Sequence, residues 1–187
     1  NQFDRAALQL DRCEERYRHW EWGYLLYLCN RDQRSMAAHT PETVWSIDMA
    51  PSAGLAITAG FDKTARGWSR ATGAPDFVYE SPHGAVIETS THPGAPLVAC
   101  AEEGGYVTLY NYETRSVAHS WRVNESGDVN CVQYSPDGAR IATADDEGHI
   151  RVWDGATRAE IYAIPPVDRG IEALAYSPDG ALLASTD

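Results

Sequence analysis

The sequence predicts an all-β fold made of about three and a half copies of one four-stranded unit, preceded by a short α-helical segment. Two observations predict the repeated unit: a turn proline recurs at positions 51, 93, 136 and 178, and a β-branched residue stands seven positions before each proline. A third observation, the helical spacing of apolar residues near the start of the chain, sets that part apart. We therefore expect a helical leader over 1–38 and a repeat region over 39–187.

The clearest copy of the unit runs from Val129 to Asp154 and contains three short strands. Its first two strands are joined by Ser135-Pro136-Asp137-Gly138, a sequence typical of a tight turn with proline second and glycine fourth. A small residue follows each turn proline by seven positions, and an aromatic residue comes ten positions later in the three longer copies. These residues are Thr58, Cys100, Thr143 and Ser185, and then Trp68, Tyr110 and Trp153.

The pattern resembles the WD-repeat family of β-propellers, in which each unit of roughly 40 to 45 residues makes one four-stranded blade. The resemblance rests on the SPDG turns at 135–138 and 177–180, the Trp153-Asp154 ending and the Ala38-His39 lead-in. It implies a partial propeller with blades at about 39–80, 81–123 and 124–165, and a partial blade at 166–187. Because three and a half blades leave the first and last ones unpaired, we expect the parent chain to supply the rest of the ring.

The resemblance also implies a buried hydrogen-bonded tetrad in the first blade, formed by His39, Thr58, Asp62 and Trp68. His, a hydroxyl and Asp are also the components of a catalytic triad, but this spacing belongs to the repeat, so we interpret the group as structural. The second blade has Cys100, Gly104 and Tyr110 at these places, with only His83 remaining, and the third has Glu147 at the acid place and Glu125-Ser126 near the lead-in. We therefore expect no complete tetrad in the second blade, and a third blade held mainly by packing.

The leader contains apolar residues at helical spacing, which predicts two short helices over roughly 3–13 and 17–29. Its aromatic stripe either packs within the protein or forms a docking face for a partner. Residues 10–29 resemble a helical leader that precedes the WD repeats of some bacterial multidomain proteins, including membrane-tethered serine/threonine kinases. That resemblance implies a kinase domain and a membrane helix before Asn1 in the parent protein, although residues 1–187 contain no kinase motif.

Composition narrows the classes of function. The net charge of −12 argues against a nucleic-acid groove and favours a protein partner with a basic segment. No apolar run is long enough for a membrane helix, and charged residues interrupt the N-terminus where a signal peptide would need an apolar core. The four cysteines lack CxxC spacing and the six histidines include no HExxH, so we expect buried free thiols, no metal and no cofactor.

We interpret the chain as a non-catalytic scaffold for protein–protein interaction. The resemblance places the partner-binding top face at Thr43, Trp45, Phe61, Glu103, Asp128, Asn130, Asp146 and Glu172. Two alternatives stay open: a sensor or regulatory region of a bacterial serine/threonine kinase or other multidomain signalling protein, and a propeller enzyme with a metal or hydrolytic site in its central channel. Unpaired cysteines favour the cytoplasm, while a membrane-tethered parent would allow another compartment.

Overall fold

The computed structural model describes residues 9–10, 12–15, 18–29, 38–39 and 41–187. The chain divides into two compact units, Asn1–Ala37 and Ala38–Asp187, which are described separately. Most of the helix expected over 3–13 lies outside the described residues.

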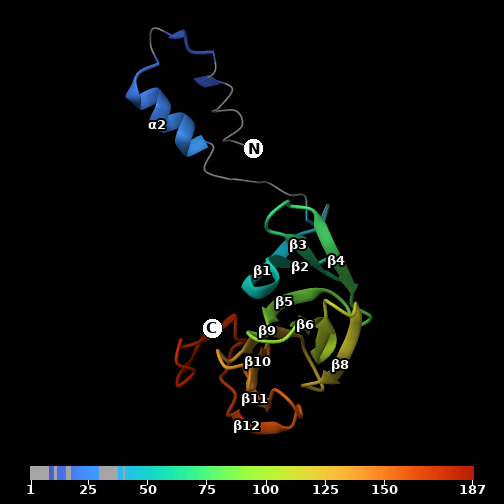
Figure 1. Ribbon diagram of the computed structural model, residues 1–187. Helices are drawn as coiled ribbons and strands as arrows, with labels where there is room; N and C mark the ends of the chain where they lie inside the picture. Colours follow the sequence, from blue (N-terminus) through green and yellow to red (C-terminus); the bar gives the residue numbers. More distant parts are fainter. Residues whose placement is uncertain (1–8, 11, 16–17, 30–37, 40) are drawn as a thin grey trace. The chain divides into compact units, whose positions relative to one another are not determined.

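The described part of the first unit contains the helix α2, Trp20–Cys29 (Figure 1). It begins three residues later than the expected helix at 17–29. Before it, the Arg18 amide donates to the Glu15 carbonyl at 3.0 Å. The Trp22 indole donates to the Leu10 carbonyl at 2.8 Å, and the Arg18 guanidinium lies over its ring. On the same helix Trp20 and Tyr24 are exposed.

The second unit consists of four antiparallel sheets, three with four strands and one with two, and each sheet takes its strands in chain order (Figure 1). The first is β1 Val44–Ala50, β2 Leu55–Gly60, β3 Thr64–Ser69 and β4 Pro75–Glu80; the second is β5 Val86–Thr91, β6 Leu97–Glu102, β7 Tyr106–Asn111 and β8 Ser116–Arg122. The third is β9 Val129–Tyr134, β10 Arg140–Asp145, β11 Ile150–Asp154 and β12 Glu160–Ile164, and the last is β13 Ala173–Tyr176 and β14 Leu183–Thr186. Short 3-10 turns, η2 Pro51–Ala53 and η3 Glu103–Gly105, join β1 to β2 and β6 to β7. The predicted fold class, a partial propeller of about three and a half blades, is confirmed.

The repeated prolines stand in the turn between the first two strands of each sheet, as the sequence predicts. In the third sheet the Gly138 amide donates to the Ser135 carbonyl at 2.8 Å, and the Ser135 hydroxyl donates to Asp137 at 2.6 Å. Gly138 has φ of 73°, a left-handed conformation that favours glycine. The same Ser–Asp bond and left-handed glycine recur at Ser177–Gly180.

Apolar side chains fill the spaces between successive sheets. Ile57, Ala59 and Phe77 of the first sheet pack with Val86 and Val98 of the second in one buried cluster. Two further clusters join the second sheet to the third and the third to the last. Each sheet therefore buries its apolar surface against a neighbour, as expected for stacked blades.

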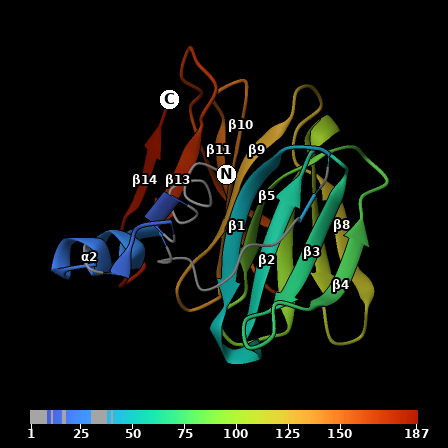
Figure 2. The same cartoon turned by 90° about the horizontal axis from the view of Figure 1, so that it is seen from above.

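The first strands of successive sheets lie side by side, as Figure 2 shows for β1, β5 and β9. Side chains on β1 accept hydrogen bonds from backbone amides of β5: the Ser46 hydroxyl from Thr89 at 3.4 Å, and the Asp48 carboxylate from Thr91 at 2.6 Å. The same relation recurs one sheet on, where Glu88 and Ser90 accept from the amides of Val132 and Tyr134 at 2.7 and 2.9 Å. These bonds set the positions of β1, β5 and β9. These strands line the inner side of the arc that the four sheets form (Figure 1).

Candidate functional site: a buried polar network in each blade and an acidic hollow

The four residues expected in the first blade's tetrad lie in one chain of hydrogen bonds. The Trp68 indole donates to the Thr58 hydroxyl at 2.9 Å, and that hydroxyl lies 2.8 Å from His39 Nε2. His39 Nδ1 lies 2.8 Å from Asp62 Oδ1, and since a carboxylate only accepts hydrogen bonds, Nδ1 is the nitrogen that donates. His39 and Thr58 are buried, so no external substrate reaches the hydroxyl, which argues against nucleophilic catalysis there.

Asp62 is the charged member of this network. Burial acts to raise the pKa of Asp62, but hydrogen bonds from Thr64 and His39 outweigh burial and lower it below its usual value. Arg66 adds an ion pair at 2.8 Å. The carboxylate therefore stays ionised, and it holds the turn between β2 and β3 to the lead-in loop.

Gly60 makes room for the His39 ring. A Cβ atom built at Gly60 would lie 2.7 Å from His39 Nδ1 and 2.8 Å from its Cγ, closer than side chains tolerate. The equivalent end of the second strand carries Glu102 in the second blade and Asp145 in the third. Five residues before the first strand, where the first blade has His39, these blades have the smaller Ser81 and Asn124.

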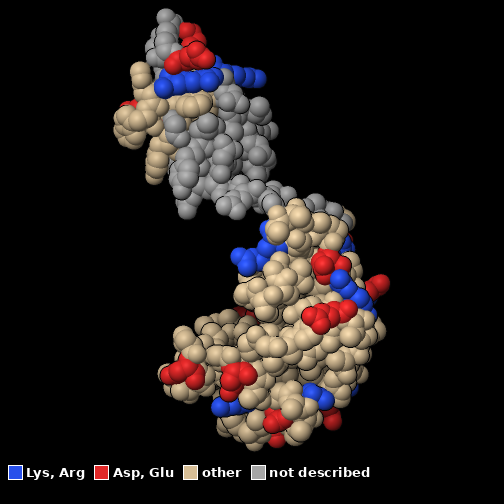
Figure 3. Space-filling view, viewed as in Figure 1, with Lys and Arg blue, Asp and Glu red and all other residues tan. Residues whose placement is uncertain are grey.

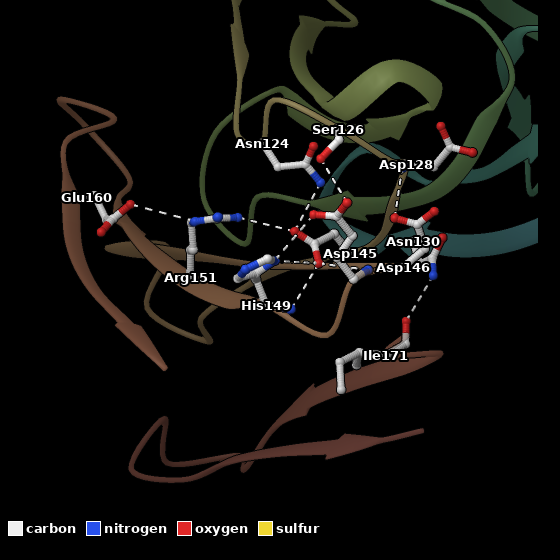
Figure 4. A network of polar contacts seen from close by, with 11 residues as sticks. Asn124, Ser126, Asp128, Asn130, Asp145, Asp146, His149, Arg151, Glu160 and Ile171 are labelled. Carbon is white, nitrogen blue, oxygen red and sulfur yellow. Dashed lines mark hydrogen bonds and ion pairs between the residues drawn. The ribbon is translucent and has the colours of Figure 1, made fainter. Parts of the chain in front are cut away.

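The third blade builds a network around Asp145, which is almost completely buried (Figure 4). Asn124 donates to its carboxylate at 3.0 Å, and Arg151 Nη1 and His149 Nδ1 each lie 3.2 Å away. Burial acts to raise the pKa of Asp145, but the bonds from Asn124 and His149 outweigh burial and lower it. In this blade too the tryptophan indole reaches the hydroxyl, Trp153 Nε1 to Thr143 at 2.9 Å.

This network corrects the expectation that the third blade relies mainly on packing. Glu147, expected at the acid place, is exposed and accepts a hydrogen bond from Ser126 at 2.7 Å instead. The acid has moved two residues earlier along the chain, to Asp145. Asn124-Glu125-Ser126 matches the sequence pattern for N-glycosylation, but Asn124 Nδ2, the atom that would carry a glycan, is buried and bonded to Asp145.

The second blade also has a buried acid that the sequence analysis missed. Glu102 is completely buried and accepts a hydrogen bond from the Tyr79 hydroxyl at 2.7 Å. His83, the residue expected to remain from a tetrad, has no direct hydrogen bond to Glu102: its ring stacks on Tyr106 with centroids 3.7 Å apart, and its Nε2 lies 3.4 Å from the Ser120 hydroxyl. Ser81, which bonds to Glu102, stands five residues before Val86. His39 and Asn124 stand at the same spacing before the first strands of their blades, so this spacing locates one member of the network in all three blades.

Half of the residues expected on the top face line one hollow of about 610 Å³ on the inner side of the arc. Its lining is Trp45, Ser46, Ile47, Ile87, Glu88, Asp128, Asn130 and Glu172. Trp45 makes an edge-to-face contact with Phe61 at 5.5 Å, and the Phe61 amide donates to the Thr43 carbonyl. About half of the surface of each of these two rings is exposed. Among the charged groups that line this hollow all are carboxylates.

Three of the acids expected on the top face, at the rim of the hollow, also have bonds within the protein. Asp128 Oδ1 accepts from the Gly104 amide of the second blade at 2.8 Å, and Asp146 accepts from the Asp128 amide at 3.1 Å. Glu103 accepts from the Ala85 amide at 2.8 Å. These acids support loops at the rim, whereas the exposed Glu172 has no such role in the described contacts.

Glu88 is a lining residue that the sequence analysis missed. Burial raises the pKa of Glu88 to about 7; hydrogen bonds from Val132 and Gln133 act against burial, and the Asp48 charge adds to it. A cation in the hollow would favour its ionised form, so the hollow gains negative charge when a basic group enters.

Other classes of site have little support. Among the described residues no group of three or more His, Cys, Asp or Glu side chains is arranged to hold a metal ion, and no helix is long and apolar enough to cross a membrane. Cys100 and Cys131 are buried free thiols, and burial raises the pKa of both.

Comparison with known proteins shows what the repeats are. The sequence pattern described as WD domain, G-beta repeat matches residues 30–69 and 115–154. Two segments of the chain are therefore similar to the WD repeat. Curated relatives include WD repeat-containing protein 1 of Gallus gallus, 45% identical over 60 residues that cover 30% of this chain and 10% of the relative. Transcription initiation factor TFIID subunit 5 of Caenorhabditis elegans is 26% identical over 146 residues, 77% of this chain and 22% of the relative.

A third relative is p21-activated protein kinase-interacting protein 1-like of Xenopus laevis, 31% identical over 126 residues, which are 67% of this chain and 33% of the relative. The chain thus spans between a tenth and a third of the length of these relatives. A chain in the crystal structure of the mitotic checkpoint complex superposes with a TM-score of 0.71 at 12% identity, over 79% of this chain and 45% of that one. This likeness supports the propeller fold.

Proposed function

We propose that this WD-repeat chain is a non-catalytic scaffold that binds a protein partner through the hollow on the inner side of its arc. The observation that carries the proposal is the lining itself, which combines an exposed indole, Trp45, with the carboxylates of Glu88, Asp128 and Glu172. A hollow of about 610 Å³ is large enough to admit one or two side chains of a partner.

The partner that suits this lining carries a basic residue next to a large apolar one. A Lys or Arg side chain would be attracted by the carboxylates and by the face of the indole ring. The apolar residue would cover the Trp45–Phe61 pair, and large aromatic side chains contribute most to the binding free energy of protein interfaces. Figure 3 shows acidic and basic side chains scattered over the face of the second unit that this view presents.

A catalytic role has less support than a binding role. Within the part of the chain that the structure describes, the arrangement that resembles a catalytic triad has its His39 and Thr58 side chains buried and hydrogen-bonded to each other, and His39 also bonds to Asp62. The described residues that line the hollow include no histidine, cysteine or serine–histidine pair. Binding therefore accounts for the site better than hydrolysis does.

The link to a bacterial kinase remains a prediction. It rests on the sequence of residues 10–29 alone, and the relatives named above come from animals. The sequence on the upstream side of Asn1 in the gene would test it: a kinase frame followed by a membrane helix supports a signalling receptor, and any other frame removes that alternative.

The binding proposal can be tested with the full chain and a library of short random peptides displayed on phage. We expect selected peptides to pair Lys or Arg with a large apolar residue. Their affinity should fall at least tenfold for the double variant Trp45→Ala/Glu172→Lys, since both a large apolar contact and charge attraction are lost. Glu172 is chosen for substitution instead of Asp146, because the Asp146 carboxylate also holds the Asp128 amide and its loss would disturb a loop.

The matched control is Glu113→Lys, which makes the same charge change at an exposed turn between β7 and β8. It should bind the selected peptides as the parent does, and both variants should keep the parent's circular dichroism. Peptides without basic residues, or peptides that bind the double variant as well as the parent, would contradict the proposal.

A further inference from the structure

Glu102, at the end of β6, is surrounded by hydroxyl groups. The Tyr79 hydroxyl donates to Oε1 at 2.7 Å, the Thr108 hydroxyl lies 3.2 Å from Oε2, and Ser81 also bonds to the carboxyl group. The whole side chain is buried, with 0% of its surface exposed. A buried carboxyl group in contact with neutral donors alone is far easier to protonate than one beside a cation.

The other two blades handle the equivalent acid differently. Two residues before the repeated aromatic, the first and third blades carry Arg66 and Arg151. Each guanidinium bonds to the carboxylate of its blade's network, Asp62 in the first blade and Asp145 in the third. The second blade has Thr108 at this place. Glu102 is thus the one network acid among the three described blades that lacks an arginine partner.

A line of hydroxyl groups connects Glu102 to the surface. The Thr108 and Ser120 hydroxyls lie 2.9 Å apart, and the Ser120 hydroxyl lies 3.4 Å from His83 Nε2. Ser120 is exposed. When Glu102 is protonated, each group can donate to the next, from Oε2 through both hydroxyls to the imidazole. When Glu102 is ionised, each of these bonds reverses, and the proton has left through His83 to solvent.

Glu102 stands directly before the turn η3, which is part of the rim. The Gly104 amide of this turn donates to Asp128 of the third blade at 2.8 Å, and Glu103 holds the Ala85 amide. A change in how Glu102 is held therefore acts on the corner where the second and third blades meet.

We propose that Glu102 and its hydroxyl relay form a proton-operated latch, in which the neutral carboxyl group keeps the η3 corner closed and ionisation opens it. The latch is independent of the binding proposal, because it concerns the local opening of the second blade and needs no partner.

The electrostatics of the surrounding groups agree with this geometry. Burial raises the pKa of Glu102 to about 7, against the lowering effect of the bonds from Tyr79, Ser81 and Thr108. The titratable groups that face it are Tyr79 of β4 and Cys100 of β6, and burial raises the pKa of both; His83, beyond the relay, has its pKa lowered by burial. Arg122 of β8 lies over the Tyr106 ring.

The sign of the effect follows from this pKa. The closed state binds a proton that the open state, with a pKa near 4.5, releases. The stabilisation of the closed corner is complete below about pH 4.5 and is lost as the pH rises to about 7. Over that range the opening constant should rise roughly tenfold for each pH unit, and above it the constant should level off.

Amide hydrogen exchange of the full chain between pH 5 and 9, corrected for the intrinsic exchange rate, measures this opening. We expect the rise at the Gly104 and Tyr106 amides, and we expect Glu102→Gln to abolish it because glutamine does not titrate. The Thr64 amide, at the corresponding turn of the first blade, is the internal control and should show no rise above pH 5. Equal pH dependence in the parent and in Glu102→Gln would overturn the latch.

A second measurement keeps the test valid if the glutamine variant does not fold. The carbon-13 resonance of the Glu102 carboxyl group in the parent should titrate near pH 7, and Thr108→Val should move the midpoint upward because one donor to the carboxylate is lost. A midpoint near 4.5 in the parent, or an unchanged midpoint in Thr108→Val, would contradict the proposal. A substitution that merely loosened the blade would not raise the midpoint.

Discussion

Replacing Gly60 by alanine tests the reasoning about the first blade's network. The new Cβ atom would lie 2.7 Å from His39 Nδ1 and 2.9 Å from the Thr43 carbonyl oxygen, so the imidazole must move away from Asp62 and Thr58. Overpacking of this kind costs about 1–3 kcal/mol of unfolding free energy. The backbone of Gly60 is not left-handed, so alanine adds no conformational strain.

The decisive comparison is a double-mutant cycle with His39→Ala. That substitution alone leaves the Thr58 hydroxyl without its imidazole partner and should cost about 2 kcal/mol. In the double variant the methyl group enters space that the ring has left. The losses of unfolding free energy in the two single variants should therefore add up to at least about 1 kcal/mol more than the loss in the double variant. The remaining contact with Thr43 makes the rescue partial.

Urea unfolding followed by tryptophan fluorescence measures these free energies. Gly94→Ala is the matched control, because the nearest atom to its new Cβ is 3.9 Å away, and it should leave stability unchanged. The reasoning would be refuted if Gly60→Ala were as stable as the parent, or if the two losses simply added.

Three further predictions concern the other buried groups. Trp68→Phe should destabilise the protein by about 1 kcal/mol more than the lost packing explains, since Thr58 loses a hydrogen-bond donor at 2.9 Å. Trp153→Phe tests the same bond to Thr143 in the third blade. If either variant were as stable as the parent, the bond would have no stabilising role. Asp62 and Asp145 have lowered pKa values, so the stability that they contribute is present above the unfolded-state pKa of 3.8 and is lost as the pH falls through the folded-state pKa. Asp145→Asn should therefore weaken the dependence of stability on acid pH. An unchanged acid transition of this variant in urea titrations would contradict the prediction. Cys100 and Cys131 should resist iodoacetamide at neutral pH until urea unfolds the chain, because both thiols are buried and have raised pKa values. Mass spectrometry locates the labelled residues. Rapid labelling of either thiol in the folded protein would contradict the prediction and would show that the blades open readily.

The strands were predictable from the sequence because each blade repeats its own local chemistry. A β-branched residue enters the first strand, and proline and glycine mark the turn, so β1 to β3 fall where the pattern of Val44 to Ser69 places them. These signals are local in the chain, and packing between blades reinforces them.

The polar networks were harder to predict because their members exchange places. The acid stands at position 62 in the first blade, but in the third blade it is Asp145, two residues earlier relative to the repeat. A fixed count from Thr143 therefore selects Glu147, which is exposed. The exchange is physically coupled to the size of the lead-in residue, since His39 requires glycine where Asn124 permits aspartate.

The rim presents a different difficulty. Sequence placed Asp128, Asp146 and Glu103 on the top face, but it did not indicate that their carboxylates accept hydrogen bonds from backbone amides. Those bonds join loops more than fifteen residues apart along the chain, for example Asp128 to Gly104, so the local pattern contains no sign of them. Glu88 was missed for the same reason, because its exposure to the hollow depends on how β5 lies beside β1 and β9.

The most direct test of the binding account is a map of chemical-shift changes when a selected basic peptide is added to the isotope-labelled full chain. Two side-chain signals report on the hollow itself, the Trp45 indole N–H and the Asn130 amide. The account predicts that both shift, and that amides near Glu172 shift with them. Changes confined to α2 or to the outer strand β12, with both signals unmoved, would contradict it.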